Sequence, residues 1–187
     1  MTQEYSSIGV LDICKKAGLA KGSFYLYFQS KEEAFLKLAL HHVSEWGGAL
    51  DLHLSKLSVQ PKYVDAATSF VESLKSFHPM LKLFSLLHSI IEKNVVPEKI
   101  LPFKLEMIQL QQRQIKQWQR LYPKMSESAA LELIIFLSAA LVGVWTIANP
   151  PPPAMLALKS AGLEDSILPF EPTLRRQIEI FLKGLLP

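Results

Sequence analysis

The sequence predicts an all-α protein, and three observations support this expectation. Apolar residues recur at intervals of three and four through most of the chain, which is the spacing of one helix face. The strict apolar–polar alternation of half-buried strands is absent, and clusters of turn residues are widely spaced. Apolar residues make up 49% of the 187 positions, enough to bury a core, so global disorder is excluded.

The first predicted unit is a pair of short helices around a tight turn, followed by a capped third helix. The first helix has one apolar face, made by Val10, Ile13, Cys14 and Ala17. Gly18 suits a left-handed position after that helix, and residues 21–28 supply a second helix of about two turns. Ser30 and Glu33 fit a capping box that opens the third helix. This order predicts a helix-turn-helix, whose second helix enters the major groove of DNA.

Residues 8–36 closely resemble the DNA-binding segment of TetR-family transcriptional repressors. The matching residues are Val10, Asp12, Ile13, Ala17, Gly18, Leu19, Lys21, Gly22, Ser23, Tyr25, Tyr27, Phe28, Ser30, Lys31, Glu32 and Phe35. The resemblance implies that the groove floor is faced by Lys21, Gly22, Ser23 and Leu26. It also implies that Tyr25, Tyr27 and Lys31 hold the DNA backbone, while Phe24 and Phe28 pack inward. The four lysines and no acids between positions 15 and 31 agree with phosphate contacts.

This segment departs from the family pattern in two respects. Family members begin with a long helix before the motif, and the nine residues ahead of Val10 cannot supply one. Three explanations stay open: a truncated chain, a start set in the wrong place, or lost DNA binding. The helix caps are also weak, because Gly9 and Ala20 stand where the family has hydroxyl residues. We therefore expect the start of the second helix to fray.

The third helix is predicted to connect a DNA-binding head to a larger helical body. It covers residues 31–57, as one helix or as two, with a kink or break at Gly47 and Gly48. The predicted domains are a head of residues 1–45 and an effector-binding and dimerisation domain of residues 46–187.

Prolines bound most of the remaining predicted helices. These helices are expected at 61–77, 80–93, 97–122 with a bend near Pro102, 126–148, 154–160 and 172–186. The four prolines at 150–153 are predicted to end the helix before them and to favour extended polyproline geometry.

The segment 126–148 is apolar enough to resemble a membrane span, and it has the length of one. Glu132 interrupts it, however, and no positive cluster flanks it closely. We therefore predict no membrane insertion but a helix buried on nearly all sides, with one face in its own core and another on a partner chain. Together with 172–186, this helix is predicted to form a homodimer interface.

Several classes of function lack support in the sequence. No catalytic motif is present, so we expect no enzyme and no cofactor. No two of the five histidines have the i, i+4 spacing of a preassembled zinc site, so we expect no metal. Cys14 is the single cysteine, and no secretory signal is apparent, which suits the cytoplasm.

Large apolar side chains on several body helices suggest a pocket for a small apolar ligand. These residues are Phe70, Phe77, Phe84, Met107, Trp118 and Trp145. Polar contacts could come from His88, Glu106 or Gln111. Alternatively, the same aromatic residues simply fill a core, but the family resemblance implies an effector site.

The expected function is a DNA-binding transcriptional regulator, a homodimeric repressor released from its operator by a small apolar effector. The alternative is a helical ligand-binding or dimer-forming protein that has lost DNA binding.

Overall fold

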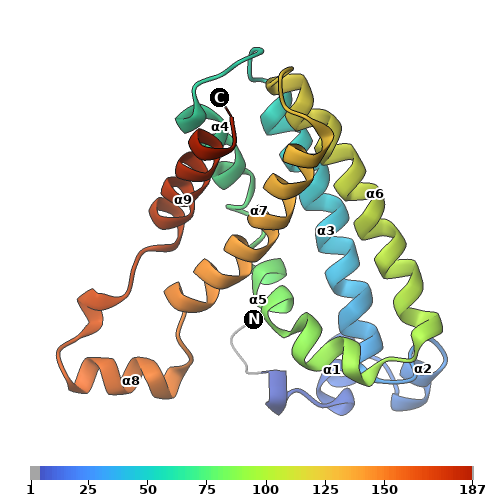
Figure 1. Ribbon diagram of the computed structural model, residues 1–187. Coiled ribbons are helices and arrows are strands. Elements are labelled where there is room, and N and C mark those ends of the chain that lie inside the picture. Colours follow the sequence, from blue (N-terminus) through green and yellow to red (C-terminus); the bar gives the residue numbers. More distant parts are fainter. Residues whose placement is uncertain (1–4, 187) are drawn as a thin grey trace.

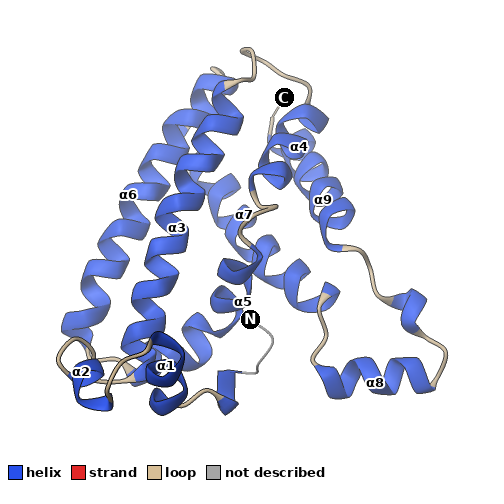
Figure 2. Cartoon of the chain, turned by 180° about the vertical axis from the view of Figure 1, so that it is seen from behind, coloured by secondary structure: helices blue, strands red, loops and turns tan. Residues whose placement is uncertain are grey.

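The computed structural model describes residues 5–186, and every regular element in that range is a helix (Figures 1 and 2). The predicted all-α class is therefore confirmed. Residues 1–4 and Pro187 lie outside the described residues. The expectation that the nine residues ahead of Val10 cannot form a long helix therefore falls partly outside them.

The head consists of two short helices at one end of the molecule. A 3₁₀ turn, Tyr5–Ser7, leads into α1 (Val10–Ala17) and α2 (Lys21–Tyr25). Helix α2 is shorter than the predicted 21–28. The physical reason is that Ser30 caps the next helix in an extended conformation (φ −146°, ψ 166°), so the chain has to leave the helical path before it.

Two long helices, α3 (Lys31–Ser55) and α6 (Pro97–Leu121), run side by side from the head toward the far end of the body (Figure 1). Of the two alternatives left open for residues 31–57, the single helix is the one found, because α3 is continuous through Gly47 and Gly48 and no break occurs there. Gly47 is buried where α6 packs closely against α3, so this glycine serves helix packing. Helix α6 begins at Pro97 as predicted and ends one residue before the predicted 122, and Pro102 lies within the helix.

The remaining body helices pack across this pair. They are α4 (Tyr63–Ser73), α5 (His78–Leu86) and α9 (Phe170–Leu185). The predicted single helix over 80–93 is instead α5, a π-helical turn at Leu87–Ile91 and a 3₁₀ turn at Glu92–Asn94. Helix α9 packs against α4 and α7, at the end of the body away from the head (Figure 1).

Helix α7 (Glu127–Ala148) begins as predicted, because the Ser126 hydroxyl accepts a hydrogen bond from the Ala129 N–H at 3.1 Å. Its core face is made by Ala130, Leu133, Leu137, Leu141 and Val144. One face lies in the core of its own chain, as predicted, and burial of another face on a partner chain stays a prediction. Only 28% of its most apolar stretch is buried, although among residues 5–186 it alone is long and apolar enough to cross a membrane. Composition sets how apolar a helix is, but not how many of its faces the same chain covers.

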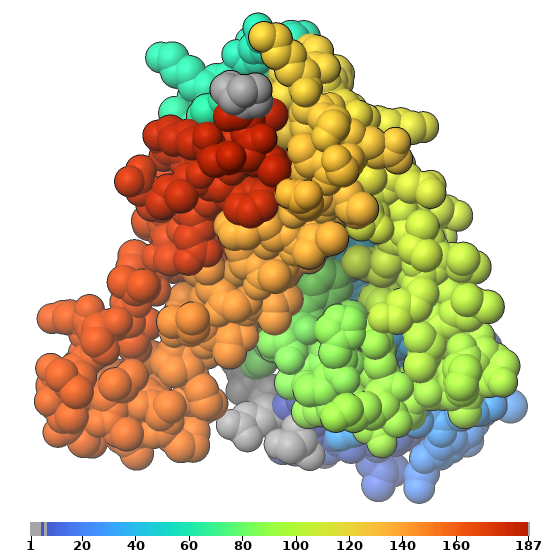
Figure 3. Space-filling view, in the orientation of Figure 1, coloured from blue at the N-terminus to red at the C-terminus, as the bar shows by residue number. Residues whose placement is uncertain are grey.

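Helix α8 (Pro152–Ser160) has no buried residue and extends away from the body (Figures 1 and 3). It begins two residues earlier than predicted, with Pro152 and Pro153 in its first turn. The prolines therefore do not form one extended run. A proline fits the first turn because its missing N–H would have no partner there.

Candidate DNA-binding head and ligand cavity

Glycines bound α1 of the helix-turn-helix at both ends, Gly9 before its first residue and Gly18 after its last. The Gly9 N–H donates to Asp12 Oδ2 at 2.8 Å, which satisfies one backbone donor at the start of α1 without a capping hydroxyl. Gly18 ends α1 in the predicted left-handed conformation (φ 67°). Ala20 gives α2 no side-chain cap. Cys14 is buried, as expected of a small core residue.

Helix α2 and the turn after it present a row of outward-facing side chains. Leu26 is 81% exposed and Tyr27 73% exposed, so neither contributes to a core. Lys21, Gly22 and Tyr25 are also exposed, while Ser23 is half-buried. Phe24 is buried with its ring 5.3 Å from that of Phe28, which is half-buried. The predicted groove-facing residues therefore share one accessible surface.

Lys31 is placed differently from the other predicted DNA contacts. Its Nζ donates to the carbonyl oxygens of Ile8 at 2.9 Å and Tyr5 at 3.3 Å, and it lies 4.3 Å from the centre of the Tyr5 ring. The Tyr5 hydroxyl donates to Glu32 Oε1 at 2.7 Å. The pKa of Tyr5 is raised, mainly by burial and further by this carboxylate. The sequence did not single out Tyr5, since its partners lie more than 25 positions away.

The first turn of α3 also joins the head to α6. Glu33 Oε2 accepts from the Gln29 N–H at 2.8 Å, while Oε1 pairs with Lys99 at 2.9 Å. Burial raises the pKa of Glu33, but the Gln29 N–H and Lys99 outweigh it and hold that pKa below its usual value. The predicted capping of α3 by Ser30 is confirmed, because its hydroxyl accepts from the Glu33 N–H at 3.1 Å.

A cavity of about 770 Å³ lies among α3, α4, α5, α6 and α7 in the body. Its volume falls within the range of small-molecule sites, and most of its lining is apolar. Of the six predicted ligand residues, the cavity is lined by Phe70, Phe84, Met107 and Trp118. Trp145 lies elsewhere, against the rings of His78 and Phe170, and Phe77 precedes α5 at the edge of the core.

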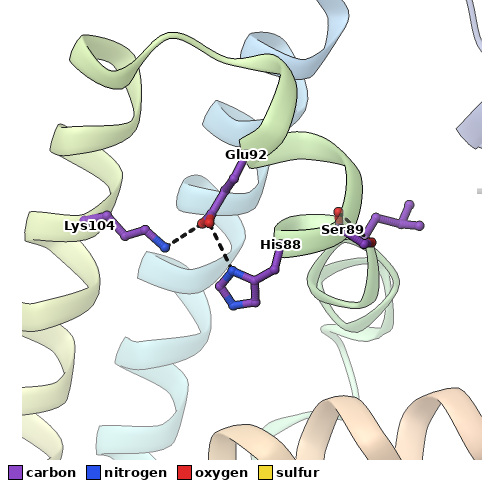
Figure 4. Close-up of polar contacts among 5 residues, drawn as sticks. His88, Ser89, Glu92 and Lys104 are labelled. Carbon is purple, nitrogen blue, oxygen red and sulfur yellow. Dashed lines mark hydrogen bonds and ion pairs between the residues drawn. The ribbon is translucent and has the colours of Figure 1, made fainter.

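The exposed end of the cavity carries a polar network that joins the π-helical turn, the 3₁₀ turn after it and α6 (Figure 4). Glu92 contacts Lys104 Nζ at 2.6 Å and His88 Nδ1 at 3.0 Å. Burial raises the pKa of Glu92, but the contacts with Lys104 and His88 hold it below its usual value. Lys104 and His88 both line the cavity, and each has Glu92 as a partner. Gln111 also lines the cavity, whereas Glu106 does not.

Two polar side chains, Gln114 and Trp118, lie at the deep end of the cavity. The sequence predicted Trp118 as a ligand contact but did not predict Gln114. Gln114 is 5% exposed and Trp118 is fully buried. The Gln114 Nε2 donates to Asp51 Oδ1 at 2.8 Å, but Gln114 Oε1 and Trp118 Nε1 have no partner. Gln114 could have been found as the one amide on an apolar helix face.

Two families match nearly the whole chain. Residues 2–38 match the family described as bacterial regulatory proteins, tetR family, and residues 40–187 match the tetracyclin repressor-like C-terminal domain. The two matches meet inside α3. No curated protein matches the chain.

Proposed function

The chain belongs to the TetR family of DNA-binding transcriptional regulators, and we propose that it is a homodimeric repressor released from its operator by a small apolar effector. One observation supports this most directly. Helix α3 begins at the end of the helix-turn-helix and contributes Trp46 and Leu50 to the wall of the cavity. A single unbroken helix thus joins the candidate DNA surface to the candidate effector site.

On the DNA side, we propose that α2 lies in the major groove. Lys21, Gly22, Ser23 and Leu26 would reach base edges, and Tyr25 and Tyr27 would hold phosphates on either side. The exposure of these residues on one surface supports this docking.

On the effector side, the proposed mechanism is a shift between two conformational populations. DNA favours one separation of the two heads, and a ligand in the cavity favours another. The effector changes the equilibrium only by its differential affinity for the two states. Because α3 and α6 both line the cavity and both reach the head, a small change in their separation would move the head.

We propose that the dimer forms through α7 and α9, within residues 126–148 and 172–186. Both helices carry exposed apolar residues, namely Leu131, Ile135 and Ile147 on α7 and Ile180 on α9. Two copies of each helix would form an isologous four-helix contact. The single buried thiol of Cys14 and the DNA target suit a cytoplasmic protein.

Selection from a random double-stranded DNA library tests this proposal. The full chain should enrich an inverted repeat, with half-sites about 34 Å apart or a multiple of that. A Lys21→Ala, Tyr27→Ala double variant is the control and should enrich nothing. Apolar compounds should then release the wild-type protein from the selected DNA. If the wild-type chain enriches no common sequence, the repressor proposal fails, and a ligand-binding protein without DNA binding becomes the better account.

A further inference from the structure

We propose that the cavity selects an apolar molecule bearing a hydroxyl group, and that Gln114 and Trp118 together bind that hydroxyl. This inference rests on the proposed function, in which the cavity holds the effector. It specifies the chemistry of that effector.

The two side chains are spaced to act on one ligand group. Gln114 and Trp118 lie four residues apart on α6, so they occupy one helix face in consecutive turns. Both line the cavity, and both are at least nine-tenths buried. Each has one polar atom without a partner, the Gln114 Oε1 and the Trp118 Nε1. Buried polar groups without partners are rare and destabilising, so a bound group that satisfies both atoms would be favoured.

Asp51 fixes which atom of the Gln114 amide is available. Its carboxylate accepts the 2.8 Å hydrogen bond from Gln114 Nε2. A carboxylate accepts and does not donate, so the amide nitrogen has to face Asp51. The amide oxygen is consequently the atom left without a partner. The ligand must therefore donate to Gln114 and accept from the indole N–H of Trp118.

A hydroxyl is the smallest group that both donates and accepts. A carboxylate could accept from Trp118 but could not donate to Gln114, and it would also approach the Asp51 charge. An ammonium group has the opposite defect, since it cannot accept. The polar groups at the exposed end do not change this preference, because Lys104 and His88 are both paired with Glu92 (Figure 4).

The rest of the lining sets the apolar part of the ligand. The same cavity is lined by Trp46, Leu50, Phe70, Leu110, Leu137 and Leu141, all of them buried. Such a wall favours an aromatic or aliphatic body without further polar groups. The class is therefore a hydrophobic alcohol or phenol.

Calorimetric titration of the full chain at pH 7 with 2-naphthol, naphthalene and 2-naphthoate tests the inference. We expect 2-naphthol to bind at least about tenfold more tightly than either analogue, because only it pairs both buried atoms. Trp118→Phe and Gln114→Met should each reduce that preference to about threefold or less. Two variants are used because Gln114→Met also leaves Asp51 without its partner.

Two matched controls separate the anchor from general effects. Ser138→Ala removes a cavity hydroxyl that already donates to the Ile134 carbonyl, and Trp145→Phe removes an indole outside the cavity. Both should keep the full preference for 2-naphthol.

Equal binding of 2-naphthol and naphthalene would overturn the anchor but leave the apolar effector site intact. No binding by any of the three would overturn the anchor and the effector site together. Preferential binding of 2-naphthol without release of DNA would uphold the anchor and remove the regulatory role.

Discussion

Gly47 of α3 lies so close to Leu110 of α6 that a methyl group on Gly47 would come within 2.7 Å of Leu110 Cδ1. The next glycine, Gly48, faces open space with nothing within 4 Å. The two neighbouring glycines therefore have different roles in the same helix. Leu110 also lines the cavity, so the contact links the packing of α3 and α6 to the shape of the candidate effector site.

This difference predicts unequal effects for two otherwise identical substitutions. Gly48→Ala should raise the free energy of unfolding by about 0.5–1 kcal/mol, since alanine favours a helix over glycine. Gly47→Ala should lack this gain, because the Leu110 Cδ1 methyl group has to shift away from the new methyl group. Urea denaturation followed by circular dichroism measures both. Equal stabilisation by the two alanines would show that the helices do not approach closely at Gly47.

Lys31 is predicted to stabilise the head without touching DNA. Lys31→Met removes the hydrogen bonds to the carbonyls of Tyr5 and Ile8 and should cost about 1–2 kcal/mol of stability. The slope of log affinity against log salt should stay unchanged, whereas loss of one phosphate contact lowers it by about 0.9. Lys37→Met, an exposed position on the same helix, is the stability control. A flatter salt slope for Lys31→Met, with stability unchanged, would restore the phosphate contact implied by the family resemblance.

Tyr27 and Lys21 are predicted to affect DNA binding in different ways. Tyr27→Ala should weaken binding to every sequence alike, because a phosphate contact carries no sequence information. Lys21→Ala and Ser23→Ala should change the discrimination between bases by about 1–3 kcal/mol. Fluorescence anisotropy with a selected site and its single-base variants separates the two effects. If Tyr27→Ala changes the ratio of affinities between sites, the proposed orientation of α2 is wrong.

The sequence predicted best those features that depend on local chemistry. The starts of α6 and α7 follow from Pro97 and from the Ser126 cap, both of which act within one turn. The left-handed Gly18 is local in the same sense. The sequence left a break at Gly47 open, because what a glycine does in a helix depends on a neighbour 63 positions away along the chain.

The candidate site shows the same limit. Apolar residues on the body helices predicted a cavity, but only packing decides which of them face it. Trp145 contacts His78 and Phe170 instead. The free amide oxygen of Gln114 depends on Asp51 of another helix, and no local pattern encodes that contact.

The exposed apolar faces of α7 and α9 predict how the chain assembles. Ile180→Glu should convert a dimer into monomers without unfolding them, since Ile180 is 53% exposed within the chain. Phe181→Glu should also disrupt the dimer, but it additionally breaks the stacking of Phe181 on Phe136 at 4.0 Å. Leu52→Glu is the matched control, because Leu52 is similarly exposed, at 58%, on α3. Sedimentation at micromolar concentration gives the answer, and a monomeric wild-type chain would contradict the proposed interface.

Filling the cavity should abolish effector binding and leave the dimer intact. Met107 lines the cavity and is only partly buried, so Met107→Trp places an indole in space that the wild-type chain leaves to a ligand. A ligand at a hundredfold excess over its Kd should stabilise the wild-type protein by about 2.7 kcal/mol and the variant by none. Thermal denaturation of both proteins against a panel of hydrophobic compounds measures this, and sedimentation checks the dimer.

If instead the cavity were closed by packing in solution, Met107→Trp would overpack the core and lower the free energy of unfolding by about 1–3 kcal/mol. That loss, with no compound stabilising the wild-type chain, would leave α3 and α6 joined by a solid core and remove the basis for effector control.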